Sequence, residues 1–285
     1  MFETVEGKAN SRWWLWVFLA RDTTVFRIEA SRSTAVLREH FGLSEDATAL
    51  PDGRRLLISA DFWTAYQCLS KLDGVDPLWC WAHIRRYFLR AGDGCPELAG
   101  WAAQWVTGRI GALYLAHTAL AATSPGTPEH TRAQQVFEKA IEHIDTARRE
   151  QSADPDLPDR ARKVLATLDH EWDGLSRHRD YPDLDLDNNR AERAIRGPVV
   201  GRKNYYGSGA VWAAGLAGQA WTITATAATA ATAGASPLTY LTDYLTACAA
   251  AGGKAPAGPA LERFLPWAAS SQDLTRWRHP AGPAP

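Results

Sequence analysis

The sequence predicts an α/β protein whose mixed strand-and-helix part is interrupted by a purely helical insertion. Strand and helix patterns alternate over about the first hundred residues. From Glu97 to about Arg179, apolar residues instead recur at helical spacing in long runs. The chain has 285 residues, of which 46% are hydrophobic and 22% charged, so a globular fold with a sizeable core is expected.

Two strands are expected near the start of the chain. Residues 12–20 and 24–30 are rich in aromatic and β-branched side chains, and the polar residues between them are typical of a turn. The two segments are therefore expected to pair as antiparallel strands. Ser33 then has a side chain suited to a helix N-cap, which predicts a helix that ends at Gly42.

A second alternation of strand and helix follows. Residues 54–60 are expected to form a strand, and Asp61 comes directly after it. Residues 62–72 suit a short helix. The apolar residues 75–83 indicate a buried strand or its end, and a further helix is expected to begin near His83.

The second half of the chain changes character several times. After the helical insertion come a strongly charged segment, residues 183–209, and a helix of small residues. A tail rich in Pro, Gly and Ala begins at Gly252 and is expected to be loosely ordered, with one docked piece at residues 261–269. The predicted domains are a first part of the α/β core, residues 1–96; the helical insertion, residues 97–180; the rest of the core, residues 181–250; and the tail, residues 251–285.

The composition points to a cytoplasmic protein without a membrane anchor. The four cysteines form no CxxC pair, which argues against a disulfide framework and favours a reducing compartment. Residues 204–242 carry no charge, but their many Ala, Thr and Gly side chains contribute little transfer energy, so a close-packed helix is expected and not a membrane span. The net charge of −1 gives no overall attraction to nucleic acid, so any such contact requires a local patch.

The charged segment contains such a patch. Asn188 or Asn189 can cap a helix there, and between Asn188 and Asn204 five cations face one anion. Three arginines recur at every third position along one side of the helix, and two more cations follow a break expected at Gly197–Pro198. A solvated face normally mixes signs, so this pattern favours a phosphate-facing surface; the plainer alternative is a solvated charge run. The cations are Arg190, Arg193, Arg196, Arg202 and Lys203.

Two carboxylates are candidates for chemistry. Asp61 follows the carboxyl end of a predicted strand, where open α/β sheets build their sites. Glu192 falls in the first turn of the helix in the charged segment. Each has a structural alternative, because Asp61 could cap the next helix and Glu192 could interact with the helix dipole. A catalytic role for Asp61 requires a second carboxylate nearby, and Glu192 is the candidate for it.

The other metal patterns in the sequence are incomplete. The three aspartates of residues 183–187 have the spacing of a calcium loop, but the glycine and the bidentate glutamate of such a loop are missing. Cys80 and His83 form half of a zinc pattern without a second pair. His83 is left with two interpretations, a polar residue held near the site or a structural histidine.

Four motifs, in this order, resemble those of transposases of bacterial insertion sequences in the group numbered sixty-six: residues 61–69, 80–88, 186–196 and 201–209. The resemblance implies an RNase H-like mixed sheet with flanking helices, a helical insertion, and a catalytic triad of two aspartates and one glutamate. Carried over by position, Asp61 matches the second aspartate and Glu192 the glutamate, as catalytic and metal-binding residues. The residues expected to contact DNA are His83, Asn189, Arg190, Arg193, Arg196, Arg202 and Lys203.

The chemistry explains why acidic and basic residues would converge. Cleaving a DNA phosphodiester and joining the freed 3′-hydroxyl to another strand both need in-line attack at phosphorus, which a pair of Mg²⁺ ions can assist. Carboxylates suit Mg²⁺, or Mn²⁺ in its place, and the cations would orient the DNA backbone. The resemblance therefore implies a two-metal site with Mg²⁺ or Mn²⁺, DNA as the partner, and a second copy of the chain or other transposition proteins as further partners.

The chain departs from the family pattern at its start. The first aspartate of the triad belongs to an Asp-Glu-Thr stretch: either Phe2, before Glu3, stands in its place, or at the usual spacing the aspartate lies before Met1. The amino-terminal DNA-binding region of the family is not found in this sequence. We therefore expect a truncated fragment that is weak or inactive in strand transfer, because losing one of three ligands weakens both metal sites. Two alternatives stay open: a non-catalytic DNA- or protein-binding module, and a divergent RNase H-like nuclease that uses Glu3 or Asp22 as its third carboxylate.

Overall fold

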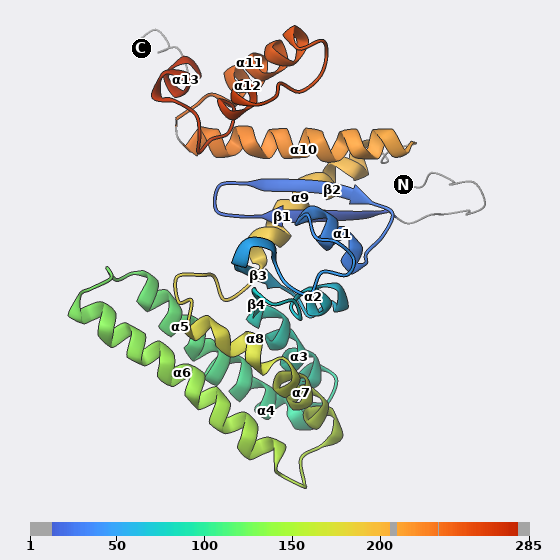
Figure 1. The fold of residues 1–285 in the computed structure, drawn as a ribbon. Coiled ribbons are helices and arrows are strands. Elements are labelled where there is room, and N and C mark those ends of the chain that lie inside the picture. Colours follow the sequence, from blue (N-terminus) through green and yellow to red (C-terminus); the bar gives the residue numbers. More distant parts are fainter. Residues whose placement is uncertain (1–12, 206–209, 233, 279–285) are drawn as a thin grey trace. The chain divides into compact units, whose positions relative to one another are not determined.

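The chain folds into two compact units, each with its own small sheet and helices (Figure 1). The computed structural model describes residues 13–205, 210–232 and 234–278. The first unit joins the two ends of the chain, Met1–Arg32 and Arg190–Pro285, and the second comprises Ser33–Asn189. The four domains expected from the sequence have other boundaries and stay a prediction. The predicted insertion, residues 97–180, lies within the second unit.

The first unit begins with the predicted hairpin. Strands β1 (Trp14–Leu19) and β2 (Thr24–Glu29) pair antiparallel, with Val17 opposite Phe26. This confirms the pairing expected from the aromatic and β-branched residues. The helices of the unit are α9 (Asn189–Tyr205), which starts at the last residue of the second unit, α10 (Val211–Thr232), α11 (Pro237–Ala250), α12 (Pro259–Glu262) and α13 (Ser271–Arg276).

Helix α10 lies along β2, and its small residues are the reason it can lie so close (Figure 1). Thr222 Oγ1 accepts a hydrogen bond from the backbone N–H of Phe26 at 2.9 Å. One turn earlier stands Gly218, where a Cβ atom would lie 3.0 Å from the carbonyl oxygen of Phe26. The small residues of α10 therefore serve close packing, as the sequence predicted. In the described part of the chain, no helix combines the length and the apolar character that crossing a membrane requires.

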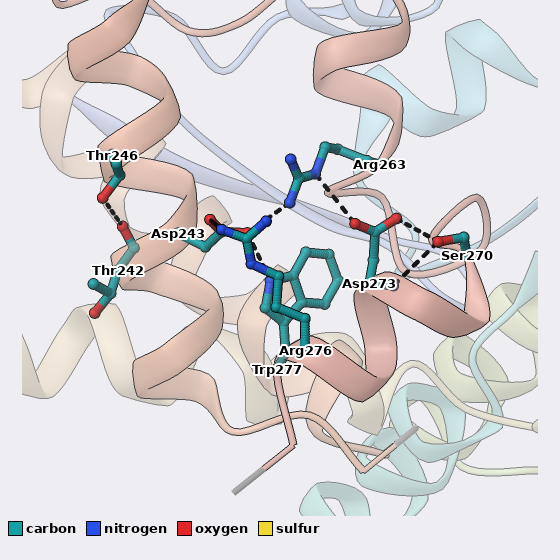
Figure 2. A network of polar contacts seen from close by, with 8 residues as sticks. All are labelled: Thr242, Asp243, Thr246, Arg263, Ser270, Asp273, Arg276 and Trp277. Atoms are coloured by element: carbon teal, nitrogen blue, oxygen red, sulfur yellow. Dashed lines mark hydrogen bonds and ion pairs between the residues drawn. The ribbon is translucent and has the colours of Figure 1, made fainter. Parts of the chain in front are cut away.

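The tail after Gly252 docks at residues 261–269 as expected, and it also docks at Trp277, where the expectation of loose order was wrong. Phe264 and Trp277 are buried against Tyr240 of α11, with ring centroids 6.0 and 5.0 Å from the Tyr240 ring. Asp243 of α11 binds this tail through three donors (Figure 2). They are Arg263 Nη2 at 2.7 Å, Arg276 Nη2 at 2.9 Å and Trp277 Nε1 at 3.0 Å.

The second unit contains a parallel strand pair and most of the helices. Strand β3 (Leu56–Ala60) pairs with β4 (Val75–Trp79), with Ala60 opposite Trp79. Its helices and helical turns are α1 (Thr34–His40), η1 (Pro51–Gly53), α2 (Thr64–Leu69), α3 (Trp81–Asp93), η2 (Pro96–Leu98), α4 (Ala99–Ala103), the π-helical turn η3 (Gln104–Arg109), α5 (Ile110–Ala121), α6 (Pro128–Ser152), α7 (Asp159–His170), α8 (Trp172–Ser176) and η4 (Arg177–Arg179).

The helices of the second unit share one core. Phe88 of α3 stacks on Trp105 of η3 with ring centroids 4.6 Å apart, and both side chains are fully buried. Helices α5 and α6 lie side by side, and Phe137 and Ile141 of α6 belong to the same buried cluster (Figure 1). The helical character expected for residues 97–179 is confirmed, because the segment contains only helices and the turns between them.

The fold is thus a mixed α/β structure with small sheets and many helices. Among the described residues, β1 and β2 pair only with each other, as do β3 and β4. The strand expected in residues 75–83 ends at Trp79, and α3 begins at Trp81, two residues before His83, near which its start was expected.

The packing of α10 on β2 predicts opposite effects for two glycines of the same helix. Gly218→Val should lower the free energy of unfolding of the first unit by about 1–3 kcal/mol, because the added methyl groups collide with the backbone of β2. Gly215→Val should be neutral or slightly stabilising, because no atom lies within 4 Å of a Cβ there and valine is a better helix former than glycine. Urea unfolding followed by tryptophan fluorescence measures both. Equal effects of the two substitutions would contradict the packing.

Candidate active site

The candidate site lies at the carboxyl ends of β3 and β4. The strands are parallel, and the backbone N–H of Cys80, just after β4, donates to the carbonyl of Ala60 at 3.0 Å. The pairing therefore reaches the last residue of β3, and Asp61 follows directly. The carboxyl ends of parallel strands meet at one edge of the sheet, so Asp61 and the start of α3 share that edge.

Asp61 is held by a local turn. Its Oδ1 atom accepts a hydrogen bond from the backbone N–H of Trp63 at 3.1 Å, and α2 begins one residue later, at Thr64. The side chain is half-buried. The carboxylate thus accepts a bond within the turn before α2. The alternative, that Asp61 caps a helix beginning at Phe62, was wrong about where the helix begins, because Phe62 lies before α2.

His83 lies at the same edge as Asp61, in the first turn of α3. Its backbone N–H donates to the carbonyl of Cys80 at 3.2 Å. The ring of Phe62, the neighbour of Asp61, packs edge-on against His83 with ring centroids 6.3 Å apart. Phe62 also contacts Trp79 and Tyr87, at 6.3 and 6.1 Å between ring centroids. This aromatic cluster fixes the strand end that carries Asp61 against α3.

The charged segment before α9 crosses the same edge. The backbone N–H of Trp81 donates to the carbonyl of Leu186 at 3.0 Å, and Leu186 is buried. The backbone N–H of Asn188 donates to Cys80 Sγ at 3.4 Å. Burial raises the pKa of the Cys80 thiol, so its sulfur accepts this bond as a neutral group. The structure therefore brings Asn188 and Asn189 to the edge that carries Asp61 and His83.

Asp187 connects the helical insertion to the start of α9. Its Oδ1 atom accepts the backbone N–H of Asn189 at 3.0 Å, so Asp187 caps the first residue of α9, where the sequence had offered Asn188 or Asn189. Its Oδ2 atom accepts the hydroxyl of Tyr114 on α5 at 3.3 Å. Burial, followed by the charge of Asp187, raises the pKa of Tyr114 well above its ordinary value, so the hydroxyl stays a donor.

Helix α9 is continuous, so the break expected at Gly197–Pro198 was wrong. Proline removes one helical hydrogen bond, yet the helix runs from Asn189 to Tyr205 with Pro198 inside it. Packing accounts for this: Pro198 is buried, and at Gly197 a Cβ atom would lie only 3.3 Å from the Trp221 ring of α10. Arg196 and Lys203, seven residues apart, therefore lie on one face of one helix.

The basic residues of α9 are exposed to solvent. None of the ion pairs in the described ranges involves them. Glu192, in the first turn, is exposed as well. The exposed cations are Arg190, Arg193, Arg196, Arg202 and Lys203.

The two candidate carboxylates belong to different units. Asp61, His83 and Asn189 lie in the second unit, whereas Glu192 and the basic residues of α9 lie in the first. The approach of Asp61 to Glu192 therefore stays a prediction. Within the described residues, no group of three or more His, Cys, Asp or Glu side chains is arranged to hold a metal ion.

The remaining candidates for a third carboxylate lie elsewhere. Glu3, like Phe2, falls outside the described residues. Asp22 is exposed in the turn between β1 and β2.

The second unit also has a pocket of about 840 Å³ that does not contain Asp61 or His83. It is lined by parts of β4, α2 and α8. Its acids and bases occur in similar numbers, and Asp76 is already bonded to two arginines, Arg55 and Arg177. The pocket therefore has no excess of one charge that would select a phosphate.

Sequence reasoning missed three exposed arginines on α3, Arg85, Arg86 and Arg90, and the roles of Tyr114 and Asp187. Two of these arginines could have been found, because His83, Arg86 and Arg90 recur at helical spacing. The bond between Tyr114 and Asp187 joins distant segments, and nothing in their local sequence indicates it.

Comparison with known proteins identifies the kind of protein to which this site belongs. Residues 1–215 match the model of the family described as Transposase IS66 family. The match covers well over half of the 285 residues, so the chain belongs to this family of insertion-sequence transposases. The resemblance seen in the four motifs is thereby confirmed, while the truncation stays a prediction. No curated protein and no solved structure matched the chain.

A buried histidine beside the site predicts how stability depends on pH. His178 Nε2 donates to the carbonyl of Trp79 at 3.1 Å, and burial lowers the pKa of His178 from 6.5 to about 4. Below pH 6.5 the unfolded chain binds a proton that the folded chain does not, so this stability is present above pH 6.5 and is lost as the pH falls to 4. The expected slope is about 1.4 kcal/mol per pH unit.

His178→Gln, whose amide can still donate to Trp79, should make the pH profile shallower in this window. Chemical unfolding at a series of pH values measures it. The control His143→Gln changes an exposed histidine of α6 and should leave the profile unchanged. Parallel profiles for the wild type and His178→Gln would contradict the assignment.

Proposed function

We propose that the chain carries the catalytic part of a DNA transposase, with an RNase H-like core, in which Asp61 and Glu192 bind divalent metal and the basic face of α9 binds the DNA backbone. The observation that carries the proposal is the arrangement at the strand ends, where Asp61 shares an edge with Cys80 and with the segment that leads into α9. Glu192 follows Asn189 by three residues on the same helix, which is about 4.5 Å along its axis.

The residues suit the chemistry of Mg²⁺ or Mn²⁺. Both ions prefer hard oxygen ligands, and Asp61 and Glu192 supply carboxylate oxygens. A bound pair of such ions would stabilise the attacking and leaving oxygens of a phosphodiester. In this proposal the chain's own residues do the rest: the turn at Trp63 holds the Asp61 carboxylate, and the exposed arginines of α9 neutralise and orient DNA phosphates.

The identity of the third ligand decides how active the chain is. If Phe2 stands where the family motif has its aspartate, Asp61 and Glu192 alone are expected to support only weak cleavage. Restoring that carboxylate should strengthen metal binding and raise the rate. A chain that is weak for this reason differs from a non-catalytic binding module, which no single carboxylate would activate.

The proposal predicts a gain and a loss of activity. Phe2→Asp should raise Mg²⁺-dependent nicking and strand transfer of a duplex carrying the element ends, because it supplies the missing ligand. Adding Asp61→Asn or Glu192→Gln to that variant should lower the rate by at least about a hundredfold, a loss on the scale seen when a catalytic group is removed. Gel assays with and without Mg²⁺ measure the rates.

The matched control is Asp183→Asn, which removes an exposed carboxylate from the same charged segment and should leave the rate unchanged. Cleavage that survives both Asp61→Asn and Glu192→Gln would refute the proposed site. Full activity of the unchanged chain, lost on Asp61→Asn, would refute only the weakness expected from Phe2. Metal-independent DNA binding without any cleavage by Phe2→Asp would favour the non-catalytic module.

A further inference from the structure

The outer face of α3 carries two arginines and two aromatic residues in one stripe. His83, Arg86, Tyr87 and Arg90 stand at positions i, i+3, i+4 and i+7, which lie on one side of a helix. The opposite face is fixed in the core of the second unit, where Trp81, Ile84 and Phe88 are fully buried. The stripe is therefore mounted on a rigid helix.

The stripe begins beside Asp61. Phe62, the next residue after Asp61, packs against the rings of His83 and Tyr87 at 6.3 and 6.1 Å. Tyr87 is half-buried, and the planes of the Tyr87 and Phe62 rings are tilted by 32°. From His83 to Arg90 the stripe then runs about 10 Å along the helix, away from the strand ends.

The arginines of the stripe are available to a partner. Arg86 and Arg90 are exposed, and neither belongs to an ion pair in the described ranges. Arg148 and Arg177 of the same unit, by contrast, are bonded to carboxylates. Asp93, three residues after Arg90, is the nearest acid along the helix and is exposed. The stripe thus combines unneutralised positive charge with aromatic rings.

We propose that this stripe binds the unpaired DNA strand that leads to the phosphate cleaved at Asp61, with Arg86 and Arg90 on successive phosphates and His83 and Tyr87 against the bases. The proposal rests on the proposed function and names the part of the substrate that α3 contacts. Basic side chains alternating with aromatic rings are typical of single-strand binding, because unpaired bases expose faces on which rings can stack. A duplex offers phosphates but hides those faces, so the aromatic half of the stripe selects the single strand.

The test measures DNA binding without catalysis. Fluorescence anisotropy in EDTA, with the full chain and a labelled oligonucleotide of mixed sequence as a single strand or a duplex, gives both affinities. Arg86→Gln with Arg90→Gln should weaken single-strand binding at least tenfold. It should also reduce the slope of log affinity against log salt by about 1.4, because each lost phosphate contact removes about 0.7.

The aromatic contribution has its own signature. Tyr87→Leu should weaken single-strand binding at least fivefold without changing the salt slope, whereas Tyr87→Phe should bind as the wild type does. Thermal melting checks that each variant is folded. The matched control is Lys139→Gln with Lys163→Gln, which removes the same charge from two exposed side chains of α6 and α7 that belong to no ion pair in the described ranges, and it should change affinity less than twofold.

The outcomes separate this inference from the proposed catalytic site. Equal losses on single strand and duplex, or no loss in the arginine double variant, would overturn it. Binding is measured in EDTA and needs no cleavage, so a chain that binds through the stripe but never cleaves would support the stripe and contradict the catalytic proposal. Cleavage by the chain, together with unchanged single-strand binding in the stripe variants, would support the catalytic proposal and contradict the stripe.

Discussion

The second unit depends on the bonds made by Cys80, the residue between β4 and α3. Its backbone N–H completes the pairing with β3 at Ala60, and its sulfur accepts the backbone N–H of Asn188. The next residue, Trp81, donates its backbone N–H to Leu186. Two neighbouring residues thus join β3, β4 and α3 to the segment that precedes α9, and burial raises the pKa of the Cys80 thiol, which keeps it neutral. The candidate site exists because β3 and β4 end, and α3 begins, at the same edge of the sheet.

The helical insertion is part of this arrangement. Tyr114 and His117 of α5 bond to Asp187 and to the carbonyl of Leu184, at 3.3 and 3.1 Å. His178, at the end of the insertion, donates to the carbonyl of Trp79. The bonds to Asp187 and to Trp79 satisfy polar groups that are partly or fully buried, where an unsatisfied group would be destabilising. The sequence of the insertion is typical of a separate helical domain, yet the insertion also positions the segment before α9.

The sequence was informative wherever a local pattern decided the structure. The β1–β2 hairpin follows from its aromatic and β-branched residues, and Asp61 could be placed because a strand visibly ends before it. The start of α9 was predicted within one residue. Local rules failed where distant packing prevailed: Trp221 and the burial of Pro198 keep α9 intact, and Asp243 orders a tail whose composition resembles a disordered one.

The site was harder to predict than the fold, because its residues are related by contacts and not by spacing. Asp61 and Asn188 are far apart in the sequence, and contacts such as those of the Cys80 sulfur and the Leu186 carbonyl bring their segments to one edge. The stripe on α3 differs, because the helical spacing of its residues can be seen in the sequence. The sequence does not show that its arginines are exposed and outside the ion pairs of the described ranges. Availability depends on which arginines the structure leaves without carboxylates.

That division among arginines explains how a chain with a net charge of −1 can present basic surfaces. Arg148, Arg177 and Arg263 are bonded to aspartates and hold helices or the tail in place. The arginines of α3 and of α9 are exposed instead, on helices whose other faces are packed. The net charge sums the paired and the exposed arginines with all the acids, so it does not show where exposed positive charge is concentrated. Attraction for a polyanion is set by the exposed group alone, because a cation already bonded to a carboxylate contributes little field beyond its partner.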